Sequence, residues 1–247
     1  MWIDSGIHAR EWISPAATTW MLKELVENDA AHADLTEQLD WYFLPSANPD
    51  GYAFSREHNR MWRKTRSDHN SFLGCKGVDA NRNWGFHFND GGSSNDKCSD
   101  TYHGPAAFSE PENQHVRDFL AARKGSVVLH NSVHSYSQLI LLPWGYTSSH
   151  PADYQTMYDI AMKGSDALTA VHGKHYDVGC IPCLLYIASG SSIDWAHGEN
   201  EVPFTTSMEL RDTGMYGFIL PPEQIIPTAE ETWAFHLTVA REILKTL

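Results

Sequence analysis

Short β-rich apolar runs alternate with segments of helical periodicity along the whole sequence, and this alternation restricts the fold more than any other feature. Apolar residues at helical spacing predict helices over 11–26, 52–62, 109–124, 151–172, 189–197 and 221–247. β-rich runs predict strands just before Gly6 and over 39–45, 126–133, 138–143 and 204–210. Chains with this alternation form α/β domains around a mostly parallel central sheet, and we predict such a domain here.

No internal repeat or linker divides the chain, so residues 1–247 are expected to form one domain with a substantial core. Residues 65–105 are polar and glycine-rich, and a connection of that length predicts a functional or disulfide-braced loop. The formal net charge of −13 argues against nucleic-acid binding, because most of the surface would repel phosphate groups. No apolar run approaches the ~20 residues that a membrane-spanning helix needs.

The N-terminus lacks the charged and apolar regions of a signal peptide. It opens directly on a strand-like segment, with nothing before it to pair with or cover that strand. We therefore expect Met1 to be an internal start, with earlier strands absent. One edge of the sheet would then be uncovered and prone to aggregation.

The chain has four cysteines, in two pairs. Cys75 and Cys98 flank a polar loop, which fits a disulfide that closes a surface excursion. Cys180 and Cys183 have the C-x-x-C spacing of a redox pair, but they lack the strand-to-helix setting of a thioredoxin motif, and no second C-x-x-C completes a zinc site. We interpret the second pair as structural or pocket-lining.

His8 and Glu11 lie at a predicted strand-to-helix junction, one helical turn apart, so the imidazole and the carboxylate can converge on one point. A catalytic zinc ion accepts such a pair together with a third protein ligand. The alternative is a surface histidine beside an i,i+3 carboxylate. The same spacing, with aspartate, occurs at His87/Asp90, His115/Asp118 and His150/Asp153.

His134 and Glu209 each lie at the end of a separate predicted strand, as His8 does. Active-site residues of open α/β sheets gather at the carboxyl ends of strands, so these three groups can reach one cleft. His134 would be the third zinc ligand, and the alternative is a buried histidine bonded to backbone. Glu209 beside zinc could remove a proton from water and return it to a leaving amine, and its alternative is an ion pair with Arg211.

Residues 78–84 supply a second polar cluster. Asp79 could hold a zinc-bound imidazole through its carboxylate. Asn81 and Arg82 could grip a substrate carboxylate, the arginine through its planar fork. Arg63 is a candidate to polarise a carbonyl group, although any of these arginines could instead be a solvated charge.

Seven stretches in the same order resemble the zinc metallocarboxypeptidases of the pancreatic carboxypeptidase A/B type. They are 6–12 (GIHAREW), 45–52 (PSANPDGY), 59–64 (NRMWRK), 77–84 (GVDANRNW), 134–138 (HSYSQ), 190–195 (GSSIDW) and 209–214 (ELRDTG). The resemblance runs from end to end. It implies a three-layer α/β/α sandwich with a mixed, mostly parallel sheet, whose N-terminal edge strands are missing from this chain.

The resemblance also implies roles for single residues. One Zn²⁺ would be held by His8, Glu11 and His134, with Glu209 as general base and acid and Arg63 on the scissile carbonyl. The substrate's terminal carboxylate would be bound by Asn81, Arg82 and Tyr186, and neighbouring subsites would be lined by Arg10 and Tyr136. Cys75–Cys98 matches a disulfide of the family.

Specificity for the C-terminal side chain is predicted at Ile193, where the family's B-type enzymes carry an acid. By the same alignment the wall of this subsite is completed by Leu141, Gly145, Ile181, Leu185, Ala188 and Ser207. An apolar wall favours an aromatic or aliphatic side chain by roughly 1.5–3 kcal/mol and penalises an unpaired charge. We interpret the adjoining Asp194 as structural, and the pocket as A-type.

The resulting prediction is a secreted zinc exopeptidase that acts on peptide or protein C-termini, with no nucleic-acid or membrane partner. Its full precursor would carry a signal peptide and an inhibitory pro-domain, both absent from this chain. The alternatives are a zinc hydrolase of esters or N-acyl amino acids, a truncated non-catalytic product that binds zinc or peptide, and a B-type enzyme, which Ile193 disfavours.

Overall fold

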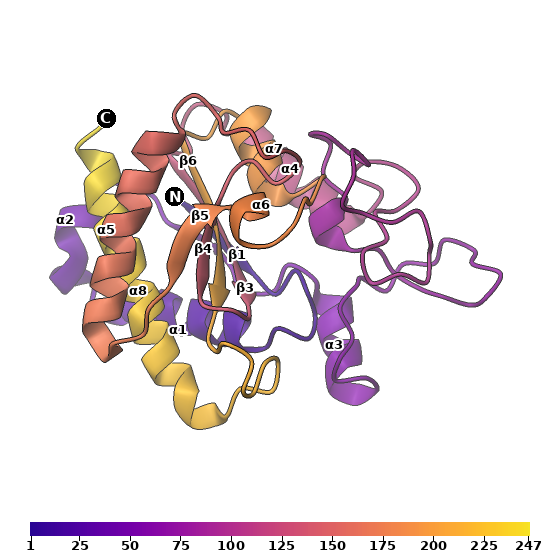
Figure 1. Cartoon of the computed structure of the whole chain (residues 1–247). Coiled ribbons are helices and arrows are strands. Elements are labelled where there is room, and N and C mark those ends of the chain that lie inside the picture. The colour runs from indigo at the N-terminus through magenta and orange to yellow at the C-terminus, as the bar shows by residue number, and fades with distance from the viewer.

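A computed structural model describes all residues, 1–247, and is built around one six-stranded sheet (Figure 1). The strands are β1 (Trp2–Ser5), β2 (Tyr42–Leu44), β3 (Leu129–Ser135), β4 (Leu139–Leu142), β5 (Asp177–Cys180) and β6 (Phe204–Leu210). Their order across the sheet is β2-β1-β3-β6-β4-β5. Every neighbouring pair is parallel except β4 and β6, which run antiparallel. The predicted mixed, mostly parallel sheet is therefore confirmed.

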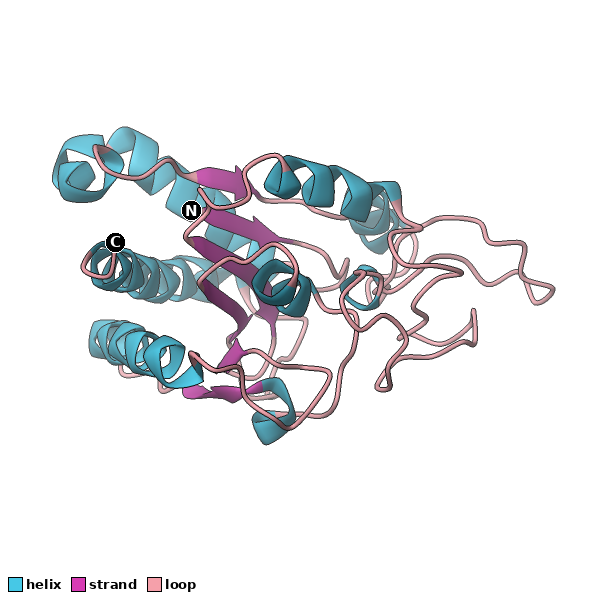
Figure 2. Cartoon of the chain, turned by 90° about the horizontal axis from the view of Figure 1, so that it is seen from above, coloured by secondary structure: helices cyan, strands magenta, loops and turns pink.

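Helices cover both faces of the sheet, which is seen from above in Figure 2. The α-helices are α1 (Ile13–Glu27), α2 (Ala33–Thr36), α3 (Pro49–Glu57), α4 (Pro111–Ala121), α5 (Tyr154–His172), α6 (Ile181–Leu184), α7 (Ser192–Gly198) and α8 (Ile225–Leu244). Short 3-10 helices span Asp29–His32, Ala80–Arg82 and Pro222–Gln224. No helix combines the length and apolar character needed to cross a lipid bilayer.

The alternation of side chains along β1 places a core on each face of the sheet. Ile3 belongs to the larger core, which α1, α5 and α8 close with residues such as Met21, Leu168 and Phe235. Trp2 points to the opposite face and packs with residues of α4 and α7, among them Trp195. The two cores give the predicted three-layer α/β/α arrangement.

The predicted helices and strands are present, with several differences, which include the unpredicted one-turn helix α2. The helix predicted at 52–62 begins earlier, at Pro49, because Asn48 is an N-cap whose side chain accepts a hydrogen bond from the Gly51 N–H at 2.9 Å. Residues 48–51 therefore form the N-cap and first residues of α3. The strand β5 and the one-turn helix α6 were not predicted, because four residues that include Gly179 carry no clear β pattern.

Residues 58–110 form extended loops beside α3 and α4 (Figure 1). Cys75 and Cys98 are joined by a disulfide within these loops, as predicted. Cys180 and Cys183 are also joined, across α6, so the chain has no free thiol.

Candidate metal centre and substrate pocket

The carboxyl ends of β1, β3 and β6 bring the predicted metal ligands and Glu209 to one edge of the sheet. His8 follows β1 by three residues, and the next turn places Glu11 just before α1. His134 lies in β3 directly opposite Glu209 in β6. The parallel register of neighbouring strands thus aligns groups that are far apart in the sequence.

Three donor groups converge on one point at this edge. His8 Nδ1 lies 2.8 Å from Glu11 Oε1, and His134 Nδ1 lies 3.1 Å from both His8 Nδ1 and Glu11 Oε2. All three residues are buried. Two imidazole nitrogens and a carboxylate are a donor set that zinc prefers.

The outer nitrogens of both histidines are engaged elsewhere. His8 Nε2 lies 3.0 Å from Asp79 Oδ1, and His134 Nε2 lies 3.1 Å from Ser132 Oγ. A neutral imidazole that donates from Nε2 presents a lone pair at Nδ1. Two such lone pairs and the Glu11 carboxylate facing one another would repel unless a cation lies between them, so the residues fit a metal ion.

The carboxylates around this point stay ionised despite their burial. Burial opposes ionisation of Glu11, but the charges and hydrogen bonds of His8 and His134 outweigh it and hold the pKa of Glu11 below its ordinary value. Burial likewise opposes ionisation of Asp79, but the charges of Arg63, His8 and Arg82 together outweigh it and hold the pKa of Asp79 well below its ordinary value. Negative charge is therefore concentrated where a cation would bind.

Glu209 differs from these two acids. Its side chain lines the pocket. Burial raises its pKa well above the ordinary range, and the negative charge of Glu11 raises it further. A carboxyl group with a raised pKa beside a metal-binding site is suited to accept and donate protons.

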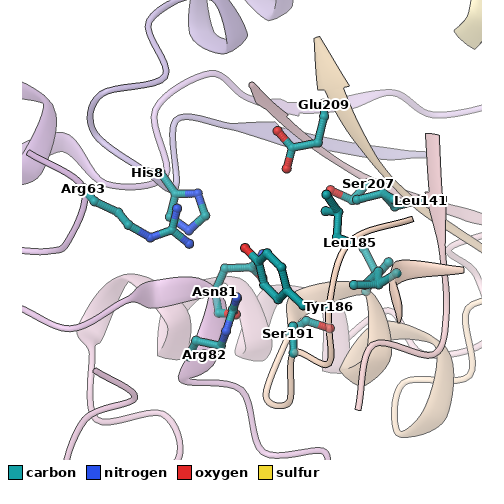
Figure 3. Close-up of a pocket in the computed structure, with 13 residues that line it drawn as sticks. His8, Arg63, Asn81, Arg82, Leu141, Leu185, Tyr186, Ser191, Ser207 and Glu209 are labelled. Atoms are coloured by element: carbon teal, nitrogen blue, oxygen red, sulfur yellow. The ribbon is translucent and has the colours of Figure 1, made fainter. Parts of the chain in front are cut away.

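Polar groups line one side of the adjoining pocket (Figure 3). Asn81 Oδ1 accepts a hydrogen bond from the Ser192 N–H at 3.0 Å, which leaves the Asn81 amide NH₂ without a protein partner. The buried Arg82 donates from Nε to Gly92 and from Nη1 to Asn81, so its Nη2 is free. Tyr186 is 56% exposed, and Figure 3 shows its hydroxyl on the side of the pocket where Arg63 and His8 lie.

Apolar side chains form the opposite, inner end of the pocket. Ile193 is 1% exposed and belongs to a small core that carries much of this wall. The other predicted wall residues that line the pocket are Leu141, Ile181, Leu185, Ala188 and Ser207. Gly145 does not line the pocket. It lies behind the wall, where an added Cβ would meet the Ala188 carbonyl at 2.7 Å and the Ile181 side chain at 2.9 Å, so Gly145 contacts two wall residues from behind.

Asp194 also lies behind the wall. Its carboxylate accepts hydrogen bonds from the Gly145 and Tyr146 N–H groups at 2.9 and 3.1 Å. Burial raises its pKa to about 7, although these hydrogen bonds act in the opposite direction. Asp194 is not part of the pocket surface, so Glu209 is the only carboxylate among the lining residues.

A second hollow continues from the pocket towards the surface. Arg10 and Tyr136 line it together with Phe218, whose ring lies 4.5 Å from the Arg10 guanidinium carbon. Arg10 Nη1 also donates to Asp100 at 3.0 Å. Sequence reasoning missed Phe218, because a single aromatic residue in a glycine-rich loop carries no pattern of its own.

Sequence reasoning also missed Asp4 and Ser132. They face each other across β1 and β3, and Ser132 contacts His134. The available indication was that polar residues occupy positions 130, 132 and 134 of β3, so Ser132 shares a face with His134.

Two histidines and a glutamate are a donor set found in catalytic zinc sites, in which three protein ligands leave one position open. A sequence model of the zinc carboxypeptidase family matches residues 1–235. The chain is 48% identical to carboxypeptidase B of Astacus astacus, over 100% of the chain and 81% of that protein. It is 45% identical to carboxypeptidase A2 of Rattus norvegicus, over 98% of the chain and 58% of that protein.

Among solved structures, bovine thrombin-activatable fibrinolysis inhibitor in complex with tick carboxypeptidase inhibitor superposes with a TM-score of 0.96 at 37% identity. That match covers 100% of the chain and 83% of the other chain. The chain belongs to the zinc carboxypeptidase family. It spans little more than half the length of the rat relative.

Proposed function

We propose that residues 1–247 act as one catalytic domain that binds one zinc ion and removes an aromatic or aliphatic residue from peptide C-termini. One observation carries the proposal. His8, one of the three converging donors, lines a pocket that also holds two unpaired hydrogen-bond donors and an apolar wall. A C-terminal residue carries a carbonyl, a carboxylate and a side chain, and these three groups of the pocket could bind one each.

The polar side of the pocket supports recognition of a free C-terminus. The unpaired donors of Asn81 and Arg82 suit a carboxylate, with the Tyr186 hydroxyl as a further donor. An amidated or internal residue would leave the buried Arg82 charge without a partner. This arrangement favours an exopeptidase.

A bound zinc ion would supply a Lewis acid that polarises a carbonyl and lowers the pKa of water. Glu209 would take a proton from the attacking water and deliver it to the nitrogen of the departing amino acid. Arg63 Nη1 makes no hydrogen bond within the protein and lies 3.8 Å from Glu11 Oε1, so it would stabilise negative charge on a scissile carbonyl oxygen beside the metal ligands. Arg10 and Tyr136 would contact residues further from the C-terminus.

The absence of an acid from the apolar wall supports A-type specificity. A lysine or arginine side chain beside Ile193 would be buried without a counter-charge, because Asp194 is directed to backbone N–H groups behind the wall. The Astacus astacus relative is named carboxypeptidase B, which makes B-type specificity the competing prediction.

Two disulfides support an oxidising, extracellular location. We propose that the protein is secreted, and that its full precursor carries an inhibitory pro-domain.

The test is hydrolysis of blocked dipeptides that end in Phe or Arg, each with zinc and with a chelator. A dipeptide that ends in Phe-amide is the matched control for the carboxylate. We expect cleavage of the Phe substrate alone, and loss of that cleavage with the chelator or with amidation. Cleavage of the Arg substrate would contradict the Ile193 argument, and no cleavage by zinc-loaded protein would contradict the proposed activity.

A further inference from the structure

A chain of buried hydrogen bonds connects Asp4 to Nε2 of His134, the ring nitrogen that faces away from the proposed metal position. Asp4 in β1 lies directly opposite Ser132 in β3, and Ser132 Oγ lies 2.7 Å from Asp4 Oδ1. His134 follows two residues later on the same face, and its Nε2 lies 3.1 Å from the same Ser132 oxygen. All three side chains are buried, so water does not compete for these bonds.

The direction of each hydrogen bond follows from the acceptor character of the carboxylate. Ser132 has one hydroxyl proton, and the carboxylate of Asp4 has none to offer. The serine must therefore donate to Asp4, which leaves only lone pairs facing His134. His134 must then donate from Nε2, and its Nδ1 is left as a lone pair.

Asp4 is itself held in one orientation. Its other oxygen, Oδ2, accepts a hydrogen bond from the Trp2 indole Nε1 at 2.7 Å, and His130 Nε2 lies 3.5 Å from the same oxygen. Oδ1 is thereby committed to Ser132. The histidine on the other side of the site needs no relay, because Asp79 contacts His8 directly at 3.0 Å.

We propose that Asp4 is a positioning residue for metal binding, which acts through Ser132 to keep the proton of His134 on Nε2 and its Nδ1 free for the zinc ion. This inference rests on the proposed function only in assigning His134 to a zinc site. It adds two residues, Asp4 and Ser132, that contact neither the zinc position nor a substrate.

The test uses two relay variants and one control. Ser132→Ala removes the relay. Asp4→Asn keeps the shape of the side chain but adds a hydrogen-bond donor. When the Asn carbonyl accepts the hydrogen bond from Trp2, the Asn NH₂ group faces Ser132. The Ser132 hydroxyl must then accept from the Asn and donate to His134. Ser165→Ala is the control, because Ser165 is also a buried serine, but it lies on α5 and donates to the Tyr176 carbonyl, away from the site.

Two readouts are needed, neither of which requires turnover. Nitrogen NMR of the metal-free protein reports which His134 nitrogen carries the proton, and competition with a chromogenic chelator gives the zinc dissociation constant. We expect both relay variants to shift His134 towards the Nδ1–H tautomer and to weaken zinc binding about 10- to 100-fold. Ser165→Ala should change neither.

A tautomer that stays at Nε2–H, with zinc affinity within about twofold of the parent in folded Ser132→Ala and Asp4→Asn, would overturn the proposal. If a single variant fails to fold, the double variant Trp2→Phe/Asp4→Asn tests the proposal instead. Without the indole donor the Asn carbonyl can turn to Ser132 and accept its hydroxyl proton. We then expect His134 to return to the Nε2–H tautomer. The proposed peptidase activity can fail independently of this proposal. In that case the parent protein would hydrolyse no peptide, while the variants would still shift the His134 tautomer and weaken zinc binding as described.

Discussion

Arg63 donates two hydrogen bonds to a single oxygen of Asp79, from Nε at 3.1 Å and from Nη2 at 2.9 Å. The other Asp79 oxygen contacts His8. One carboxylate thus orients both a proposed zinc ligand and the arginine proposed to act on the scissile carbonyl. The charges of Asp79 and Glu11 raise the pKa of Arg63, against the opposing effect of its burial, so Arg63 stays protonated.

Removal of this carboxylate should affect both stability and zinc binding. Asp79→Ala would leave Arg63 as a buried charge without its main partner, and we expect the free energy of unfolding to fall by about 3–5 kcal/mol. Loss of the His8 contact should weaken zinc binding about 10- to 100-fold. Urea unfolding of metal-free protein and a chelator competition measure the two effects.

The double variant Arg63→Met/Asp79→Ala is the control for the stability effect. It removes both charges, so it should recover most of the lost stability while zinc binding stays weak. If the free energy of unfolding of Asp79→Ala lies within about 1 kcal/mol of the parent value, Asp79 is not the main partner of Arg63.

Glu209→Gln should separate metal binding from turnover. The amide keeps the size of the side chain but cannot accept and return a proton, so kcat should fall about 10²- to 10⁴-fold. Zinc content should remain one ion per chain, because Glu209 is not among the three converging donors. Metal analysis and steady-state kinetics on the same preparation test this, and near-parental kcat would remove Glu209 from its proposed role.

The sequence was sufficient to predict the sheet, its helices and the convergence of His8, Glu11, His134 and Glu209, because periodicity and strand ends carry that information. It did not predict β5, whose four residues have no pattern until β4 pairs with them. The contacts of Asp4 with Ser132 depend on the register between two strands, which single-strand patterns do not contain. The depth of Gly145 behind the pocket wall likewise depends on tertiary packing.

Ile193→Asp should change the preferred C-terminal residue. The aspartate would remove apolar contact from the Phe side chain of the substrate. Complete loss of the burial of that side chain costs roughly 1.5–3 kcal/mol, which would lower kcat/KM for the Phe-ending dipeptide by up to about 10- to 150-fold. The same carboxylate would pair with Arg, so kcat/KM for the Arg-ending dipeptide should rise. Ile193→Val is the control, which keeps the wall apolar and should retain the Phe preference. An unchanged ratio of the two kcat/KM values in Ile193→Asp would show that this position does not determine specificity.

Asp194 should make stability depend on pH between about 4 and 7. Burial raises its pKa in the folded protein from 3.8 to about 7, so in this interval the folded state holds a proton that the unfolded state has released. The free energy of unfolding should therefore fall as pH rises, by at most roughly 1.4 kcal/mol for each pH unit from this group. Below pH 4 both states are protonated and above pH 7 both are ionised, so the contribution is constant there.

The variant Asp194→Asn isolates this effect from other titrating groups. It cannot ionise, so the difference in unfolding free energy between the parent and the variant should change across pH 4–7 and stay level outside that range. The offset at low pH reports the altered hydrogen bonds to the Gly145 and Tyr146 N–H groups, whereas the slope reports ionisation alone. Parallel stability curves for the two proteins would mean that Asp194 ionises equally easily when folded and unfolded. In that case its three short contacts with backbone N–H groups would fully compensate for its burial.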